Sequence, residues 1–359
     1  MQNLLVTGGA GFIGSNFVRY MLAHEPEIHI VNLDVLTYAG TTENLKDLPD
    51  PARHTFVEGN ITDRALVDLL MHKYRIDTVV HFAAETHVDR SIHFPELFLE
   101  TNVVGTHTLL AAARQYWITE GAFPLDQVRF HHVSTDEVFG SLAPTDPAFN
   151  EDTPYDPRSP YSASKAASDH FVRAYFHTYK LPVTITNCSN NYGPYQFPEK
   201  LIPVMIANAV EGKPLPVYGD GMQIRDWLYV DDHSEAIRRV IRSGTPGETY
   251  SVGGDNQPPN LEVIQTLCHI LDELRPNAPH APHENLITYV KDRPGHDRRY
   301  AIDASKVKRE LGWQPAESFE SGLRKTVQWY LDNQAWAREV TSGAYRNWIA
   351  ANYGTRGAA

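Results

Sequence analysis

Thr7-Gly8-Gly9-Ala10-Gly11-Phe12-Ile13-Gly14 is the stretch that decides the fold of this 359-residue chain. It follows the apolar run Leu4-Leu5-Val6 and contains G-x-G-x-x-G from Gly9 and G-x-x-G-x-x-G from Gly8. Such glycines permit a tight strand-to-helix turn and let the backbone approach a pyrophosphate, which the helix N-terminus stabilises. A glycine-rich turn without a ligand is common, so the position of this one between a strand and a helix favours a dinucleotide site.

An acidic residue follows at the spacing that a dinucleotide site needs. Asp34 lies twenty residues after Gly14, at the end of the second apolar run, 28–33. A carboxylate there accepts hydrogen bonds from both ribose hydroxyls and repels a 2′-phosphate. We therefore expect NAD rather than NADP as the cofactor.

Short apolar runs alternate with helical patterns through the first half of the chain. We expect strands near 4–6, 28–33, 55–57, 78–82, 128–133 and 183–186, with helices from about 13, from about 63, over 95–115 and from about 161. This rhythm is typical of the α/β class, with a Rossmann-type, doubly wound parallel sheet covered on both faces.

Prolines and glycines break the rhythm after Cys188 and predict a smaller, irregular C-terminal substrate-binding region. We expect a NAD-binding domain over 1–190, with 223–250 and part of 315–340 packing back onto it. Segments 191–222 and 251–314 then form a sugar-nucleotide-binding cap, and 354–359 form a disordered tail. Within this half we expect a strand over 227–230, a helix capped by Asp231-Asp232, and a helix over 261–274.

The composition narrows the class of partner. The net charge of −12 argues against nucleic acid or a membrane surface as a partner, although a local basic pocket for a phosphorylated small molecule stays possible. We expect a cytoplasmic protein for three reasons. The chain has only two cysteines, its start does not resemble a leader, and it has no apolar run of about 20 residues that could span a bilayer. We expect no metal site, because His131-His132 point to opposite faces of a strand and His280 and His283 lack close carboxylate or thiol partners.

Two pairs of residues carry the chemistry. Asp136-Glu137 end the fifth apolar run, and Tyr161 and Lys165 share one face of the helix that Ser159 and Pro160 begin. A nearby ammonium and a positive nicotinamide ring both favour tyrosinate, so Tyr161 could act as a base. With 18 tyrosines, about one Tyr-x-x-x-Lys spacing is expected by chance, so its place after the fifth strand is what supports it.

The two acids raise a geometric question. Neighbouring residues of a strand point to opposite faces, so Asp136 and Glu137 reach one substrate only if the chain turns there. Asp136 must also be protonated to act as an acid, and burial beside an anionic neighbour raises a carboxyl pKa in that direction.

With these motifs the sequence resembles the extended short-chain dehydrogenase/reductase superfamily and, within it, the nucleoside-diphosphate-sugar 4,6-dehydratases. The resemblance runs to about residue 330. Besides the glycine turn, it rests on the segments 81–91 (HFAAETHVDRS), 134–140 (STDEVFG), 161–165 (YSASK), 190–194 (NNYGP) and 293–299 (RPGHDRR).

The resemblance implies a dehydration in which NAD is recycled. dTDP-glucose is oxidised at C4, loses water across C5 and C6, and regains the hydride at C6 to give dTDP-4-dehydro-6-deoxy-glucose. By resemblance, Tyr161 is the base at O4 and Lys165 supports it, while Thr135 hydrogen-bonds near O4. Glu137 takes the C5 proton and Asp136 protonates the departing C6 oxygen.

The resemblance also implies the binding residues. The cofactor contacts are Gly8, Gly11, Phe12, Ile13, Gly14, Asp34, Val35, Leu36, Thr37, Asn60, Ile61, Phe82, Ala83, Ala84, Glu85, Thr86, Thr101, Tyr161, Lys165 and Asn191. The substrate contacts are Thr86, Thr135, Asn190, Lys200, Leu201, Pro216, Val217, Tyr218, Arg225, Asn260, Asp292, Arg293, Pro294, Gly295 and His296. Physical chemistry supports Tyr218 as a stacking face and Arg225 as a phosphate fork, with Arg298 as a further anion contact.

Two positions depart from the pattern of the relatives. Asn60 stands where many carry an aspartate near the adenine, so we expect an amide contact there. Thr86 replaces the more usual serine and keeps its hydroxyl.

Several alternatives stay open. A 4,6-dehydratase acting on UDP-glucose or CDP-glucose differs only in the base pocket. A 4-epimerase or decarboxylase shares the glycine turn and the Tyr/Lys pair but typically lacks Asp136-Glu137, and a catalytically silent NAD-binding regulator would need neither acid. The resemblance also implies a homodimer through helices near 95–115 and 161–179, and it leaves open whether rhamnose or another deoxysugar is the end product.

Overall fold

The computed structural model describes residues 1–37, 39–292 and 297–341. Its strands are β1 Asn3–Thr7, β2 His29–Asp34, β3 His54–Glu58, β4 Thr78–His81, β5 Arg129–Thr135, β6 Val183–Cys188, β7 Asn190–Tyr192, β8 Leu215–Tyr218, β9 Trp227–Tyr229, β10 Thr249–Val252 and β11 Ile287–Val290. Its helices are α1 Phe12–His24, α2 Arg64–Lys73, α3 Val88–His93, α4 Pro95–Phe98, α5 Thr106–Ala113, α6 Pro160–Tyr179, α7 Leu201–Val210, α8 Val230–Ser243, α9 Asn260–Leu274, α10 Ser305–Leu311, α11 Phe319–Asp332 and α12 Gln334–Val340.

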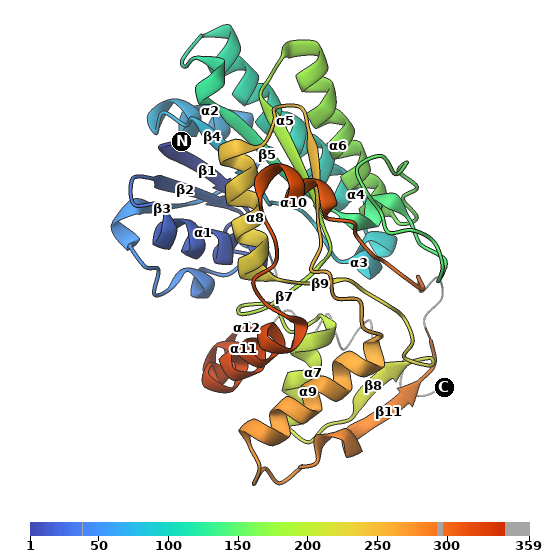
Figure 1. The fold of residues 1–359 in the computed structure, drawn as a ribbon. Coiled ribbons are helices and arrows are strands. Elements are labelled where there is room, and N and C mark those ends of the chain that lie inside the picture. The colour runs from blue at the N-terminus through green and yellow to red at the C-terminus, as the bar shows by residue number, and fades with distance from the viewer. Residues whose placement is uncertain (38, 293–296, 342–359) are drawn as a thin grey trace.

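Seven parallel strands form the main sheet, in the order β10-β6-β5-β4-β1-β2-β3 (Figure 1). The chain starts in the middle and winds out in both directions, so the expected doubly wound Rossmann-type sheet is confirmed. The six predicted strands are present with slightly different ends, and β10 joins the sheet as a seventh beside β6. Because all strands run in one direction, β1, β2, β4, β5 and β6 end at the same edge of the sheet.

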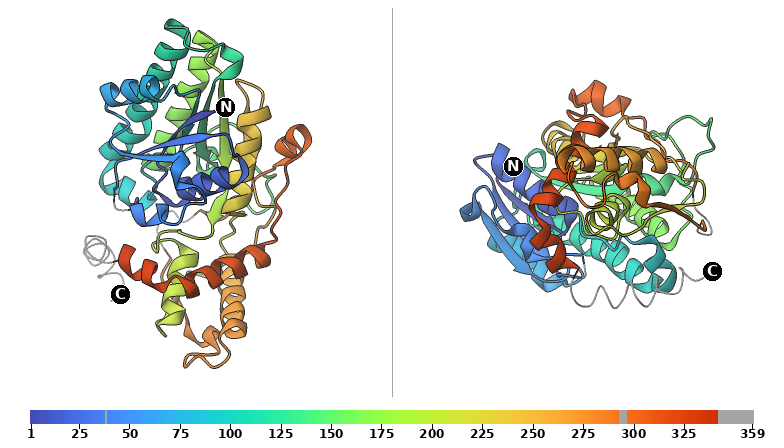
Figure 2. Two further views of the ribbon diagram at one scale, coloured as in Figure 1. Left: turned by 90° about the vertical axis from the view of Figure 1, so that its left-hand side faces the viewer. Right: turned by 90° about the horizontal axis from the view of Figure 1, so that it is seen from below.

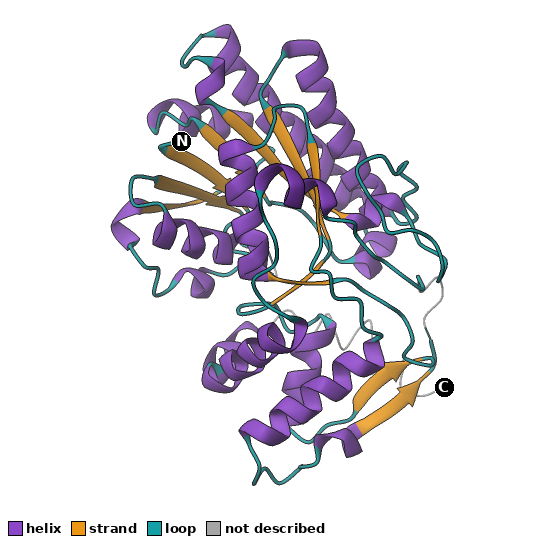
Figure 3. Ribbon diagram, in the orientation of Figure 1, coloured by secondary structure: helices purple, strands orange, loops and turns teal. Residues whose placement is uncertain are grey.

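Alternation along each strand explains why both faces of the sheet are covered. On β1, Leu5 packs into a core with side chains of α2, α5 and α6, whereas Leu4 and Val6 pack on the other face against Phe17 of α1 and Ile237 of α8. All of these side chains are buried. Figure 3 shows the helices on the two sides of the strands, as the continuous apolar runs of a parallel sheet require.

The smaller region lies beyond one end of the main sheet (Figures 1 and 2). Helices α7, α9 and α11 bring apolar faces together over Leu215, Val217 and Tyr192 in a separate core. Two short parallel pairs complete it: β7 with β9, and β8 with β11. This irregular construction from distant segments agrees with the many prolines and glycines in the sequence after Cys188.

The segments after residue 222 contact both regions. Helix α8 lies against α1, and α10 lies against α8 and β10, on the side of the main sheet. Helix α11 contacts α9 and α7 of the smaller region, although Trp336 of α12 donates to Asn44 beside the glycine turn. The α10 segment, which the sequence suggested for the cap, therefore lies on the main sheet, because Val307 and Trp313 share a core with Tyr250 and Val252 of β10.

Asp231 and Asp232 do not cap α8, and that prediction is wrong. The helix already begins at Val230, with Tyr229 as the N-cap residue, so both acids lie in the first turn. Asp232 instead accepts hydrogen bonds from the backbone N–H groups of Ala316 and Glu317 at 2.9 and 3.1 Å. The carboxylate ties α8 to the segment before α11.

The helix predicted over 95–115 is longer and less regular than expected. Two π-helical stretches, Leu99–Gly105 and Arg114–Thr119, continue α4 and α5. Within the described residues, we find no helix that is long and apolar enough to cross a membrane.

Candidate active site at the carboxyl edge of the main sheet

The glycine turn after β1 leaves no room for larger residues at three positions. Gly8 has φ +74°, and a Cβ there would lie 2.6 Å from the backbone nitrogen of Ala83. A Cβ on Gly14 would lie 2.2 Å from the carbonyl oxygen of Gly8, and one on Gly9 would meet the side chain of Asn32. Gly11 is the N-cap of α1, and no side chain among the described residues caps that helix. The backbone N–H groups of its first turn therefore face an open cradle that suits a pyrophosphate.

Asp34 lies beside this cradle. Its carboxylate accepts hydrogen bonds from the backbone N–H groups of Ala10 and Leu36, each at 2.9 Å. Burial raises the pKa of Asp34, and these backbone hydrogen bonds lower it in part. The carboxylate links the glycine turn to the end of β2, in the position that a ribose diol requires.

The other predicted cofactor residues line the same edge. Val35 and Thr37 follow Asp34 and are exposed, whereas Ile61 is buried. The Asn60 side chain accepts from the backbone N–H of Thr62 at 3.0 Å and is exposed. The segment 82–86 follows β4, and Thr101 and Asn191 lie on the π-helical stretch after α4 and on β7. Their roles as contacts stay predictions.

The chain turns directly after β5, which answers the geometric question about the two acids. Thr135 ends the strand, and Asp136–Phe139 form a 3₁₀ turn. The Thr135 hydroxyl accepts from the backbone N–H of Glu137 at 3.3 Å and donates to Asp136 Oδ1 at 3.3 Å. The strand alternation ends at Thr135, so Asp136 and Glu137 no longer have to point to opposite faces.

Asp136 is the more deeply buried of the two acids. Its residue is 2% exposed, and Oδ2 has no hydrogen-bond partner among the described residues. Burial raises the pKa of Asp136 well above its usual range, and the charges of Glu137 and Asp226 raise it further, against a smaller opposing effect of Arg225. The predicted direction is confirmed: Asp136 is a carboxylic acid that is able to donate a proton.

Tyr161 and Lys165 lie one turn apart at the start of α6. The predicted N-cap is confirmed, because Ser159 accepts from the backbone N–H of Ser162 at 3.0 Å and Ser162 accepts from that of Ser159 at 3.0 Å. Pro160 occupies the first turn. This capping box fixes where α6 begins, and therefore the position of Tyr161 relative to the turn after β5.

The pKa of Tyr161 departs from our expectation. Burial raises it well above the usual range for a phenol, and the charges of Glu137 and Cys188 raise it further. Lys165 does not offset this, because its Nζ donates to the Val133 carbonyl at 2.9 Å and burial lowers its own pKa. The protein itself therefore holds Tyr161 as a neutral phenol.

The predicted substrate residues gather at the junction with the smaller region. Asn190 on β7 and Asn260 at the start of α9 each have a buried side-chain oxygen without a hydrogen-bond partner among the described residues. Lys200 is the N-cap residue of α7, before Leu201, and Pro216, Val217 and Tyr218 belong to β8. Asp292 accepts from Gln223 Nε2 at 2.9 Å.

Arg225 is almost completely buried in this junction. Its guanidinium donates to the carbonyls of Ile224 and Asp297 and lies 4.5 Å from the centre of the Tyr300 ring. Arg298, a further anion candidate, forms an ion pair with Asp220 at 3.0 Å. The predicted contacts Arg293, Pro294, Gly295 and His296, like the tail 354–359, lie outside the described residues.

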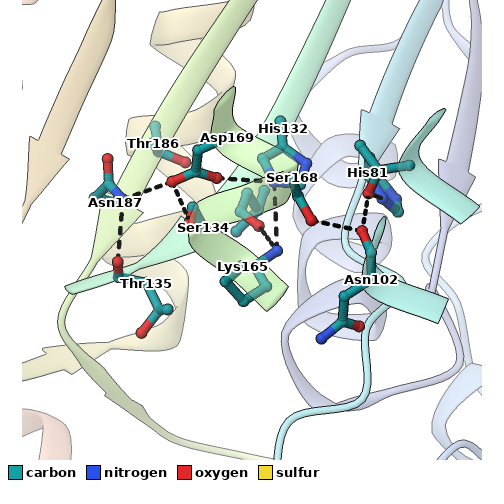
Figure 4. A network of polar contacts seen from close by, with 12 residues as sticks. His81, Asn102, His132, Ser134, Thr135, Lys165, Ser168, Asp169, Thr186 and Asn187 are labelled. Carbon is teal, nitrogen blue, oxygen red and sulfur yellow. Dashed lines mark hydrogen bonds and ion pairs between the residues drawn. The ribbon is translucent and has the colours of Figure 1, made fainter. Parts of the chain in front are cut away.

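Sequence reasoning missed the polar network beneath the catalytic pair (Figure 4). Asp169 and His132 are both fully buried there, with Nε2 of His132 3.1 Å from Oδ1 of Asp169. Asn102 holds the loop after β4 by bonding both the N–H and the carbonyl of Glu85 and also reaches Ser164. The spacing of Tyr161, Lys165 and Asp169 at every fourth residue of one helix was the signal that could have found Asp169.

The chemistry of the edge combines three functions. The glycine turn and Asp34 are suited to hold a dinucleotide, Tyr161 and Lys165 have the spacing of a hydride-transfer pair, and Asp136 and Glu137 are candidates for an acid and a base. Among residues 1–37, 39–292 and 297–341 we find no cluster of three His, Cys, Asp or Glu side chains that could hold a metal ion.

Comparisons with known proteins agree with this chemistry. The family model for GDP-mannose 4,6 dehydratase matches residues 5–326. The dTDP-glucose 4,6-dehydratase of Neisseria meningitidis serogroup B is 58% identical over 348 residues, which cover 96% of this chain and 98% of the relative.

Solved structures extend the likeness to three dimensions. The dTDP-glucose 4,6-dehydratase of Bacillus anthracis in complex with NAD has a TM-score of 0.82 at 46% identity and covers 95% of this chain and 100% of its own. A UDP-glucose 4-epimerase from Thermotoga maritima has a TM-score of 0.81 at only 27% identity, covering 93% of this chain and 100% of its own. The fold is thus common to dehydratases and epimerases, and the match over residues 5–326 shows that this chain belongs to the GDP-mannose 4,6 dehydratase family.

Proposed function

We propose that this protein dehydrates dTDP-glucose to dTDP-4-dehydro-6-deoxy-glucose. The buried acid Asp136 beside Glu137 is the observation that carries the proposal, because elimination of water needs an acid and a base at one site. The identity of 58% to a dTDP-glucose 4,6-dehydratase over nearly the whole chain supports dTDP-glucose as the substrate.

NAD is the cofactor, and the chain fits it. The turn Gly8–Gly14 suits the pyrophosphate, and the Asp34 carboxylate suits the ribose hydroxyls of a dinucleotide without a 2′-phosphate. When bound there, NAD would supply the hydride acceptor for the oxidation at C4 and the hydride donor for the reduction at C6. Because a nearby cation lowers a phenol pKa, we expect Tyr161 to act as a base only in the cofactor-bound protein.

Each side chain then has one task. Tyr161 takes the proton of the C4 hydroxyl, with Lys165 close by and Thr135 hydrogen-bonding near the same oxygen. The C4 ketone makes the C5 proton acidic, and Glu137 removes it. Asp136 protonates the C6 hydroxyl, which leaves as water, and Glu137 finally returns its proton to C5.

The proton count of this cycle explains the contrast between the two acids. Glu137 gains and returns a proton in one turnover, whereas Asp136 loses a proton and Tyr161 gains one. Glu137 therefore has to start ionised and Asp136 protonated. The raised pKa of Asp136 meets this requirement, and Glu137 itself contributes to it.

The substrate is held across the junction between the two regions. We assign Asn190, Asn260 and Thr86 to the sugar and diphosphate, together with Arg225 and Lys200. The orphaned buried oxygens of Asn190 and Asn260 support this, since buried polar atoms in folded proteins are normally paired. Leu201, Pro216, Val217 and Tyr218 line the slot for the base.

The protein also forms a homodimer through α3, α4, α6 and the π-helical stretch after α4. Large apolar side chains are exposed along these helices: Ile92 62%, Phe94 48%, Leu97 43%, Leu99 58%, Val104 47% and Phe171 41%. A patch of this kind is typical of a protein interface.

Sedimentation velocity is expected to give a particle of two chains, and replacing Ile92 and Leu99 with Glu should yield monomers. A monomeric wild-type protein at micromolar concentration would contradict the dimer.

The direct test of the function is incubation with dTDP-glucose without added reductant. Mass spectrometry should show loss of water from the sugar nucleotide while total NAD stays constant. UDP-glucose, CDP-glucose and GDP-mannose serve as parallel substrates and should react far more slowly. An unchanged sugar, or a C4 epimer of unchanged mass, would refute the proposal.

Glu137→Gln tests the base. The variant removes the charge at nearly constant shape, so it should bind NAD as the wild type does while the overall rate falls by about 10²–10⁴-fold. Isotope exchange at C5 in deuterated water should slow in parallel. Wild-type turnover in this variant would remove Glu137 from the mechanism.

Asp136→Asn tests the raised pKa through stability. In the wild type the folded state keeps this proton above pH 3.8, where the unfolded chain has lost it, so stability falls as the pH rises from there to the raised pKa. The variant lacks this penalty. Its thermal midpoint relative to the wild type should therefore be higher at pH 8 than at pH 4, while turnover is lost; a difference that does not depend on pH would contradict the raised pKa.

A further inference from the structure

We propose that Asp169 is a positioning residue whose buried carboxylate holds the end of β5 against α6, and with it the acid–base pair against the hydride-transfer pair. This inference rests on the proposed function. None of the tasks assigned above to the catalytic residues uses Asp169, yet the residue lies on the same face of α6 as Tyr161 and Lys165.

The Asp169 carboxylate joins four parts of the chain. Its Oδ2 accepts hydrogen bonds from Ser134 Oγ on β5 and from the Tyr155 hydroxyl in the loop before α6, each at 2.8 Å. Asn187 on β6 reaches the same oxygen at 3.4 Å. Oδ1 faces His132 Nε2 at 3.1 Å. Figure 4 shows Asp169 near Ser134, Asn187 and His132, with Lys165 alongside.

These contacts reach the catalytic turn directly. Ser134 precedes Thr135, and Asn187 also donates to the Thr135 carbonyl at 3.0 Å. Thr135 in turn orders Asp136 and Glu137 through its hydroxyl. A shift of Asp169 relative to β5 can therefore reach both acids through Ser134, Asn187 and Thr135.

The carboxylate also supplies charge. Burial alone raises its pKa, but the hydrogen bond from His132, the charge of Lys165 and the hydrogen bond from the Tyr155 hydroxyl outweigh burial, so the pKa of Asp169 is lowered. Arg173, which donates to the Tyr155 hydroxyl at 2.8 Å, adds a positive group on the same side. Asp169 is therefore an anion with no exposure to solvent.

Asp169 acts electrostatically on Lys165, which lies one turn earlier on the same face of α6. Burial lowers the pKa of the Lys165 ammonium, and Asp169 and Cys188 oppose that effect. His132, 3.4 Å from Nζ, is neutral because burial lowers its pKa to about 4, and burial likewise keeps His81 neutral. Asp169 is thus the strongest influence that keeps Lys165 charged beside Tyr161.

Asp169→Asn separates this role from simple packing. The amide keeps the size of the side chain but removes the charge and replaces one acceptor oxygen by a donor. We expect kcat on dTDP-glucose to fall by about 10²-fold, as for a displacement of about 1 Å at a reacting group, with KM changed much less. The alkaline limb of the kcat profile should move to lower pH, because Lys165 loses its proton more easily.

Asp232→Asn is the matched control. Asp232 is also buried, and its carboxylate accepts two backbone hydrogen bonds away from the site. It should lose thermal stability while kcat and the alkaline limb stay at their wild-type values. The same pattern in Asp169→Asn would show that Asp169 is merely structural and overturn the proposal.

Two further measurements cover the remaining outcomes. If Asp169→Asn does not fold, the double variant Ser134→Ala/Tyr155→Phe removes two hydrogen bonds to Asp169 and leaves the charge of Asp169 in place. In that variant kcat should fall while the alkaline limb stays unmoved, and an unchanged kcat overturns the proposal.

If the wild type does not convert dTDP-glucose, the proposed function fails, but a crystal structure of Asp169→Asn still tests the positioning role of Asp169. Lys165 Nζ should then leave the Val133 carbonyl, and an unchanged contact overturns the proposal.

Discussion

The hydrogen bond from the Glu137 backbone N–H to the Thr135 hydroxyl is the contact on which the site depends. It ends the alternation of β5 and starts the 3₁₀ turn at the carboxyl edge of the sheet. If the strand continued, Asp136 and Glu137 would point to opposite faces of the sheet. The turn therefore allows two adjacent acids at the end of a strand to serve one site.

Burial then divides the work between the two carboxyl groups. The more buried Asp136 has its pKa raised by desolvation and by Glu137, so the environment favours the protonated form of Asp136. A structurally similar UDP-glucose 4-epimerase shares the fold with a TM-score of 0.81, in keeping with the rule that function resides in the site and not in the fold. Hydride transfer alone does not require the two acids at the end of β5.

Local patterns predicted most of the fold because each acts within a few residues. The glycine turn, the apolar runs of the parallel strands and the cap at Ser159 all specify local structure, and they are present as expected. The cap predicted at Asp231 and Asp232 was wrong because the sequence does not distinguish an acid that caps a helix from an acid in the first turn whose side chain binds another segment. β10 escaped direct prediction because its four residues, Thr249-Tyr250-Ser251-Val252, are too few and too polar to form a clear apolar run.

Long-range contacts could not be predicted from the sequence. The pKa of Tyr161 in the protein alone depends on burial and on Glu137, which is distant along the chain, whereas our expectation rested on Lys165 and on a bound nicotinamide ring. Asp169 meets Ser134, Asn187 and Tyr155 only after four segments have folded together.

The proposed elimination depends on a protonated Asp136, and infrared difference spectroscopy measures that protonation state directly. Subtracting the spectrum of Asp136→Asn from that of the wild type at pH 7 should leave the C=O stretch of a protonated carboxyl group, which shifts in deuterated water. A difference spectrum that shows only the bands of an ionised carboxylate would contradict the claim that Asp136 is the acid of this site.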